Sequence, residues 1–135
     1  GSAMSPLVQA ASVAAWGDEA HVVANRALYR AKFEQVTPLL SGALDVALPD
    51  AGFYLWAGVP VTDPGTRASG GGDDVAFARG LLAQYNVTVL PGSLLARDAH
   101  GINPGRGRIR MALVAGVEEC LEAAHRIVSF TKSLA

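Results

Sequence analysis

Apolar residues recur at helical spacing through the first third of the chain. After Gly17, apolar side chains return at intervals that keep them on one helix face, with charged residues between them. The stripe consists of Val22, Tyr29, Phe33, Val36 and Leu40. This pattern predicts an amphipathic helix of several turns, capped by Asp18. Because Pro38 lacks a backbone N–H and clashes with the preceding turn, we expect the helix to bend or end near Thr37.

Two shorter helices are indicated by their first residues. The run Ser5-Pro6 suits an N-cap and a first helical position, which predicts a helix over residues 7–15. The pair Asp73-Asp74 supplies suitable caps for another helix, which runs to about residue 85. Residues 62–72, directly before these caps, are rich in glycine and small polar residues and are expected to form a surface loop.

A last amphipathic helix is predicted at the end of the chain. Glu118 and Glu119 lie in its first turn and Lys132 in its last, an arrangement that the helix macrodipole favours. Its inward stripe is expected to be Val117, Leu121, Ala124, Val128 and Thr131.

The period changes to that of a strand after the long helix. Leu44, Val46 and Leu48 alternate with other residues, and the run Phe53-Tyr54-Leu55-Trp56 is strongly strand-forming. Residues 49–52 between them have the composition of a turn. The segment therefore predicts a β-hairpin.

Further short strands are expected over residues 87–90 and 108–114, separated by an irregular segment over residues 97–107. The order α, α, β, β, α, β, β, α predicts an α+β fold, a small mixed or antiparallel sheet with helices packed mainly on one face. Residues 1–4 resemble the scar that remains when a purification tag is removed. Residues 5–135 are expected to form one domain.

Composition excludes several classes of function. Half of the residues are hydrophobic and the formal net charge is −1, so we expect neither a nucleic acid nor a membrane as partner. Cys120 is the single cysteine, which excludes an internal disulfide. His21, His100 and His125 share no metal-ligand spacing, so no metal site is predicted. These features fit a cytoplasmic protein that handles small molecules.

The strand predicted over residues 108–114 carries the most distinctive candidate side chain. Alternation along a strand places Ile109, Met111 and Leu113 on one face and Arg110 on the other. Because the apolar face must meet the helices, Arg110 is directed away from the core. A guanidinium offers a planar fork of donors that matches a carboxylate, so Arg110 is a candidate carboxylate receptor, or else a solvated arginine on an exposed face.

The chain resembles the C-terminal small domain of class I and II aminotransferases of fold type I. In that family a G-x-hydrophobic-R-hydrophobic-S/A strand supplies the arginine that binds the substrate α-carboxylate. The matching runs are Trp16-Gly17-Asp18-Glu19-Ala20-His21-Val22, Asn25-Arg26, Tyr29, Lys32-Phe33, Pro49-Asp50-Ala51-Gly52-Phe53-Tyr54-Leu55-Trp56, Asn86-Val87-Thr88-Val89-Leu90-Pro91-Gly92-Ser93, His100-Gly101-Ile102-Asn103-Pro104-Gly105 and Gly107-Arg108-Ile109-Arg110-Met111-Ala112. Within the family, the combined pattern is most similar to succinyldiaminopimelate aminotransferases.

This resemblance implies a parent enzyme that depends on pyridoxal phosphate and is expected to be a homodimer. It would transfer an amino group between glutamate and N-succinyl-2-amino-6-oxopimelate in lysine and diaminopimelate biosynthesis. Arg110 would bind the α-carboxylate of an amino or keto dicarboxylic acid, with Phe53 and Ser93 as active-site neighbours. The resemblance also implies a large cofactor-binding domain, which these residues do not include.

The chain departs from the family at the cofactor. The lysine motif that forms the Schiff base has no counterpart here, and Lys32 and Lys132 both lie on expected helices, where a solvated or dipole-complementing role fits better. We therefore expect this chain alone to contain no catalytic residue, to bind no cofactor and to be inactive. Three alternatives remain: a part of another class I aminotransferase, a free-standing module that binds amino or keto acids, and a purely structural domain whose Arg110 is only an exposed arginine. Apolar surface that faces a missing domain also predicts self-association through the helix after Glu19.

Overall fold

A computed structural model of the chain describes residues 3–62 and 72–134. The predicted surface loop over residues 62–72 therefore lies almost entirely outside the described residues. The elements follow one another as α1 (Pro6–Gly17), α2 (Ala20–Ser41), β1 (Tyr54–Gly58), α3 (Asp74–Tyr85), β2 (Leu90–Pro91), α4 (Gly92–Leu95), β3 (Arg108–Ala112) and α5 (Val117–Ser133). This mixture of helices and strands confirms the predicted α+β class.

The strands form an antiparallel sheet in the order β1-β3-β2, so β3 is central. Tyr54 pairs with Ala112 at one end of the β1–β3 ladder and Gly58 with Arg108 at the other. Backbone hydrogen bonds extend this ladder beyond both ends, from Leu113 to the carbonyl of Phe53 and from Val59 to that of Gly107. A central strand bonded on both sides is held more firmly than an edge strand.

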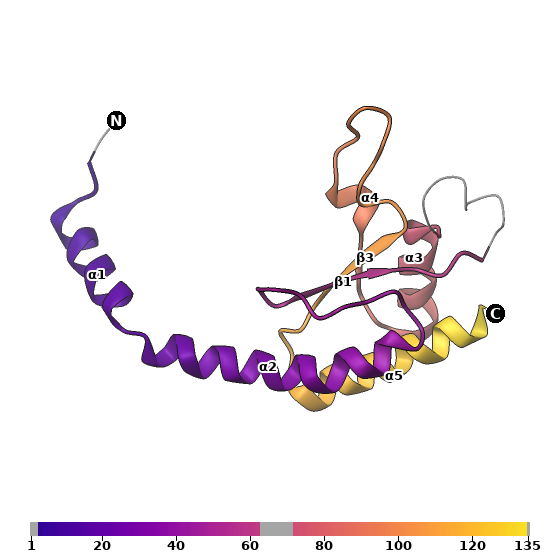
Figure 1. Cartoon of the computed structure of the whole chain (residues 1–135), viewed down its shortest axis with the longest axis horizontal. Helices are drawn as coiled ribbons and strands as arrows, with labels where there is room; N and C mark the ends of the chain where they lie inside the picture. Colours follow the sequence, from indigo (N-terminus) through magenta and orange to yellow (C-terminus); the bar gives the residue numbers. More distant parts are fainter. Residues whose placement is uncertain (1–2, 63–71, 135) are drawn as a thin grey trace.

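Three helices share the core with one face of this sheet. Helices α2 and α5 lie side by side, and α3 packs beside α5 (Figure 1). The most deeply buried large side chains are Phe130, Leu40, Leu55, Leu81, Ile109 and Val36. They come from all three helices and from β1 and β3, so the prediction that helices cover mainly one sheet face is confirmed.

Helix α2 continues through Pro38 to Ser41, so of the two predicted outcomes, a bend or an end near Thr37, the end did not occur. Pro38 lies in the last turn, where its missing N–H removes one hydrogen bond and leaves few residues of helix beyond it. Leu40, on the far side of Pro38, is only 1% exposed in the core. Its burial, worth about 2 kcal/mol, offsets part of the proline penalty.

The predicted β-hairpin is reduced to a single bridge between Asp45 and Gly58. Strand β1 instead pairs along its whole length with β3. Pro49 cannot donate to a ladder, and Gly52 has a φ of 87°, so residues 49–52 do not continue a regular strand. The strand expected over residues 87–90 is likewise shorter and shifted, because only Leu90–Pro91 pair with β3.

The final helix presents a different face to the core from the predicted one. Its buried residues are Cys120, Ala124, Ile127 and Phe130. Phe130 determines this rotation, because its ring packs edge-on against Phe77 with centroids 5.1 Å apart. Of the predicted stripe, only Ala124 is fully buried, and the other members are partly exposed at its margin.

The first helix and the beginning of α2 project from this body as an arm (Figure 1). Ser5 caps α1 as predicted, accepting from the Val8 amide, but no residue of α1 is buried. Apolar side chains on the arm are open to solvent, with Trp16 84% and Leu28 60% exposed. Along the described ranges 3–62 and 72–134, no helix is long and apolar enough to cross a bilayer.

Candidate carboxylate-binding site

The outward face of β3 carries two arginines with different surroundings. Arg108 forms an ion pair with Asp45, with 3.4 Å between its Nη2 and a carboxylate oxygen. Arg110 pairs in the ladder with Trp56 on β1 and with Leu90 on β2. No carboxylate among residues 3–62 and 72–134 lies within ion-pair distance of Arg110. Within these residues, Arg108 is thus the arginine of this face that has a carboxylate partner.

Arg110 rests on an aromatic side chain. Its guanidinium carbon lies over the ring of Tyr54, 4.5 Å from the ring centroid. Behind Tyr54 is the ring of Phe53, at 4.2 Å between centroids. Phe53 in turn contacts Tyr29 of α2, at 5.7 Å. The predicted neighbour Phe53 thus contacts Tyr54, the ring over which the Arg110 guanidinium lies.

Ser93, the other predicted neighbour, is held through its backbone. Its N–H donates to Asp74 at 2.8 Å, and its carbonyl accepts from the Asn103 side-chain amide at 3.0 Å. Gly92 beside it lies so close to the next segment that a Cβ there would be 2.3 Å from the Gly105 carbonyl oxygen and 2.8 Å from that of Arg108. The start of α4 at Gly92 and Ser93 is therefore packed against the chain that leads into β3.

Asp74 is the residue of this region whose role the sequence did not reveal. It was expected to be a helix cap, but Asp73 takes that position and accepts from the Ala76 amide at 2.8 Å. Asp74 is 3% exposed, and its two oxygens accept from the Ser93 amide and, at 3.2 Å, from the Gly107 amide. It joins the first turn of α4 and the residue before β3 to the start of α3. The sequence signal for Asp74 was that two acidic residues stand side by side at the start of α3, where one is enough to cap the helix.

Neither lysine has the surroundings of a cofactor lysine. The ammonium of Lys32 donates to the Leu113 carbonyl at 2.8 Å and lies 4.8 Å from the centre of the Tyr29 ring. It therefore caps the end of β3. Lys132 is exposed in the last turn of α5. The residues present thus do not fit covalent attachment of pyridoxal phosphate.

Histidines and acidic residues form no metal site in the parts of the chain that the structure describes. His21 contacts Asp18 at 3.4 Å near the start of α2, and its side chain is mostly exposed. His100 and His125 are exposed on a loop and on α5. The three histidines thus lie on three separate parts of the fold.

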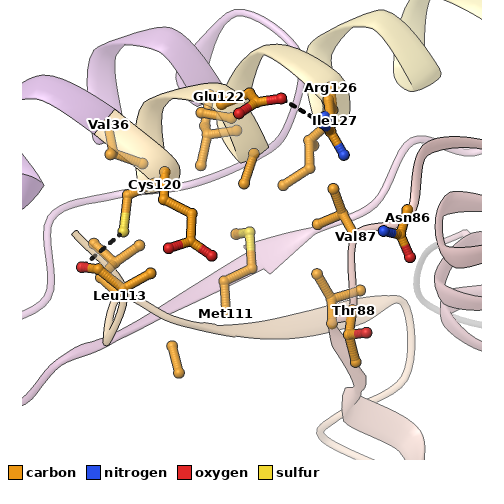
Figure 2. A pocket seen from close by; sticks show the side chains of 17 residues that line it. Val36, Asn86, Val87, Thr88, Met111, Leu113, Cys120, Glu122, Arg126 and Ile127 are labelled. Atoms are coloured by element: carbon orange, nitrogen blue, oxygen red, sulfur yellow. Dashed lines mark hydrogen bonds and ion pairs between the residues drawn. The ribbon is translucent and has the colours of Figure 1, made fainter. Parts of the chain in front are cut away.

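A cavity of about 350 Å³ opens on the helix side of the sheet (Figure 2). Apolar side chains such as Val36, Met111 and Ile127 line it, and Glu122 and Arg126 pair with each other at its margin. The Cys120 thiol is also part of the lining. Burial raises its pKa, while the charge of Lys32 lowers the pKa and that of Glu119 raises it. None of the predicted site residues lines this cavity.

A second hollow, of about 830 Å³, lies between the beginning of α2 and the segment before β1. Tyr29 and Phe53 line it, together with Arg26 and Arg30. Tyr29 and Phe53 are also the first two rings of an aromatic row, Tyr29, Phe53 and Tyr54, whose last ring contacts Arg110. The two candidate neighbours of Arg110 thus differ, because Phe53 borders a hollow whereas the backbone of Ser93 is used in packing.

The chain is similar in sequence to known aminotransferases. The sequence profile described as aminotransferase class I and II matches residues 2–127. A probable aminotransferase of Mycobacterium tuberculosis is 36% identical over 121 residues, which cover 89% of this chain and 25% of that protein.

Solved structures of aminotransferases superpose on the chain. An aminotransferase from Neisseria meningitidis superposes with a TM-score of 0.80 at 53% identity, covering 96% of this chain and 30% of that one. A probable N-succinyldiaminopimelate aminotransferase from Thermus thermophilus superposes with a TM-score of 0.58 at 34% identity, covering 76% of this chain and 24% of that one. The chain thus spans about a quarter to a third of the length of these relatives.

Proposed function

The chain belongs to the class I and II aminotransferase family, and we propose that it provides the carboxylate-binding part of a longer aminotransferase. In this proposal residues 5–135 are the C-terminal small domain, and Arg110 binds the α-carboxylate of the amino or keto acid. The observation that carries it is the guanidinium of Arg110 on a central strand, which has no carboxylate partner among residues 3–62 and 72–134, whereas Arg108 on the same face is paired with Asp45.

The position of Arg110 suits this task. A carboxylate can accept two parallel N–H bonds from a guanidinium, and such charge-assisted pairs are stronger than neutral hydrogen bonds. Strand β3 is bonded on both sides, so the base of the arginine side chain is fixed. Holding one end of an amino acid in place orients the bonds at its α-carbon for reaction.

Chemistry at the α-carbon requires a group from outside these residues. Members of this family generally depend on pyridoxal phosphate, which stabilises negative charge at the substrate α-carbon when bound. Since Lys32 and Lys132 do not fit its attachment, the cofactor lysine would lie in the remainder of the longer protein. We expect this chain by itself to bind substrate carboxylates without transferring amino groups.

The proposed substrate is N-succinyl-2-amino-6-oxopimelate, with glutamate as amino donor. The resemblance of the combined motifs supports it, as does the similarity to the probable N-succinyldiaminopimelate aminotransferase from Thermus thermophilus. The more similar Neisseria meningitidis structure is described only as an aminotransferase, so other dicarboxylic substrates compete with this proposal. The parent enzyme is proposed to be a cytoplasmic homodimer.

Calorimetric titration of the chain with L-glutamate tests the proposal. We expect Arg110→Ala to weaken binding about a hundredfold, because two charge-assisted hydrogen bonds are lost. Arg108→Ala is the matched control, since it removes an arginine from the same face that already has a partner. The proposal is wrong if the unaltered chain does not bind L-glutamate or if the two variants weaken binding equally.

A further inference from the structure

The contact between Arg110 and Tyr54 differs in kind from the other arginine contact on this face. Tyr54 is 37% exposed, and it pairs in the ladder with Ala112, two residues beyond Arg110. The guanidinium thus reaches diagonally across the sheet to lie over the ring, 4.5 Å from its centroid. Arg108 instead meets the carboxylate of Asp45. One arginine contacts an aromatic face and the other an acid.

The ring of Tyr54 is itself supported from behind. Phe53 lies against it, and Tyr29 of α2 lies against Phe53. Lys32 lies one turn after Tyr29 on α2. Its ammonium lies over the Tyr29 ring and donates to the Leu113 carbonyl just after β3. The aromatic row is therefore connected to a helix and to the end of the strand that carries Arg110.

We propose that Tyr54 is a positioning residue, whose ring holds the guanidinium of Arg110 ready for a carboxylate. An aromatic face attracts a cation through its quadrupole and accepts none of its N–H groups in an ordinary hydrogen bond. The side chain is thereby ordered before the ligand arrives, which lowers the entropy lost on binding. A carboxylate at the place of Tyr54 would order the arginine too, but it would occupy the donors. The relevance of this role to substrate rests on the proposed function.

The test compares Tyr54→Leu, which removes the ring, with Tyr54→Phe, which keeps it. Trp16→Leu controls for loss of an exposed aromatic residue far from the site, since Trp16 is 84% exposed on α1. Two quantities are measured on the labelled chain. The first is the NMR resonance of the Arg110 Nε–H group, identified by its loss in Arg110→Lys, and the second is the affinity for L-glutamate.

We expect the ring of Tyr54 to shift the Arg110 resonance in the unaltered chain, in Tyr54→Phe and in Trp16→Leu. The resonance should move to that of a free arginine in Tyr54→Leu. Affinity for L-glutamate should fall about three- to fivefold in Tyr54→Leu and stay nearly unchanged in the other two variants.

An Arg110 resonance that is the same in Tyr54→Leu and the unaltered chain would overturn the inference. So would an altered resonance with undiminished affinity for L-glutamate. The unaltered chain could fail to bind L-glutamate while the Arg110 resonance still moves to that of a free arginine in Tyr54→Leu. In that case the proposed function fails and the positioning of Arg110 by Tyr54 stands. The two proposals are thus separated by the two measurements.

Discussion

The two faces of β3 share one backbone but differ in what covers them. On the inward face, Ile109 is 0% and Met111 is 6% exposed, and both are packed into the core beneath the helices. On the outward face, Arg108 and Arg110 are partly exposed beside Asp45 and the ring of Tyr54. The inward side chains fix where the strand lies, and the outward side chains remain partly accessible.

Under the proposed function, this difference separates stability from recognition within a single strand. Buried apolar side chains contribute through the area removed from water and through close packing, so they are sensitive to size. An exposed guanidinium contributes little to folding, and its usefulness depends on free donors and a fixed position. We therefore expect substitutions on the two faces to have opposite profiles, with large losses of stability from one and losses of binding from the other.

Replacement of Ile109 by alanine should give the largest effect. The side chain is fully buried, so the lost burial and the remaining cavity should lower the free energy of unfolding by about 3 kcal/mol. That is a large fraction of the stability of an ordinary domain. Arg110→Ala is the control from the opposite face, and it should cost about 1 kcal/mol or less. Urea denaturation measures both, and equal losses would contradict the separation of the two faces.

Asp74→Ala should have the next largest effect, because Asp74 supports the outward site from a buried position. Its removal leaves the amides of Ser93 and Gly107 without their partner, at a cost of about 2–3 kcal/mol. Asp73→Ala, the adjacent control, removes only a helix cap and should cost about 1 kcal/mol.

Urea denaturation and amide hydrogen exchange test the prediction for Asp74. Exchange at Ser93 and Gly107 should become faster in Asp74→Ala and stay unchanged in Asp73→Ala. If Asp73→Ala proved the more damaging of the two, the buried carboxylate would not be what holds the turns together.

Local patterns were sufficient where neighbouring residues determine the outcome. The alternation of β3, the helix over Asp74–Tyr85 and the cap at Ser5 all follow from nearby residues, and the structure confirms them. The α+β class followed from the order of such elements. The direction of Arg110 away from the core was also predictable, because the apolar face of β3 had to be the covered one.

The remaining features depend on partners distant in sequence. Helix α2 passes Pro38 because Leu40 is buried by other elements, and α5 is rotated because Phe130 meets Phe77. The partners of Asp74, at the start of α4 and directly before β3, lie 19 and 33 residues away along the chain. The diagonal contact of Arg110 with Tyr54 requires the ladder register between β1 and β3, which no local pattern specifies.

The smallest expected effect concerns the core beneath the inward face of β3, where Cys120 of α5 is 6% exposed. Burial is the main cause that raises the pKa of this thiol above its ordinary value of 9.0. Since the folded-state pKa is the higher one, the thiol's contribution to stability is present below the ordinary pKa and is lost as pH rises through the folded-state value.

Stability should therefore decline slightly more in the unaltered chain than in Cys120→Ser when the pH is raised through that range, because serine does not titrate there. Free energies of unfolding measured on both sides of the ordinary pKa test this difference. Parallel declines would show that the thiol does not contribute. The same comparison made with Arg110→Ala in place of Cys120→Ser should show no difference from the unaltered chain, because a guanidinium stays charged throughout this range and its face of β3 is partly exposed.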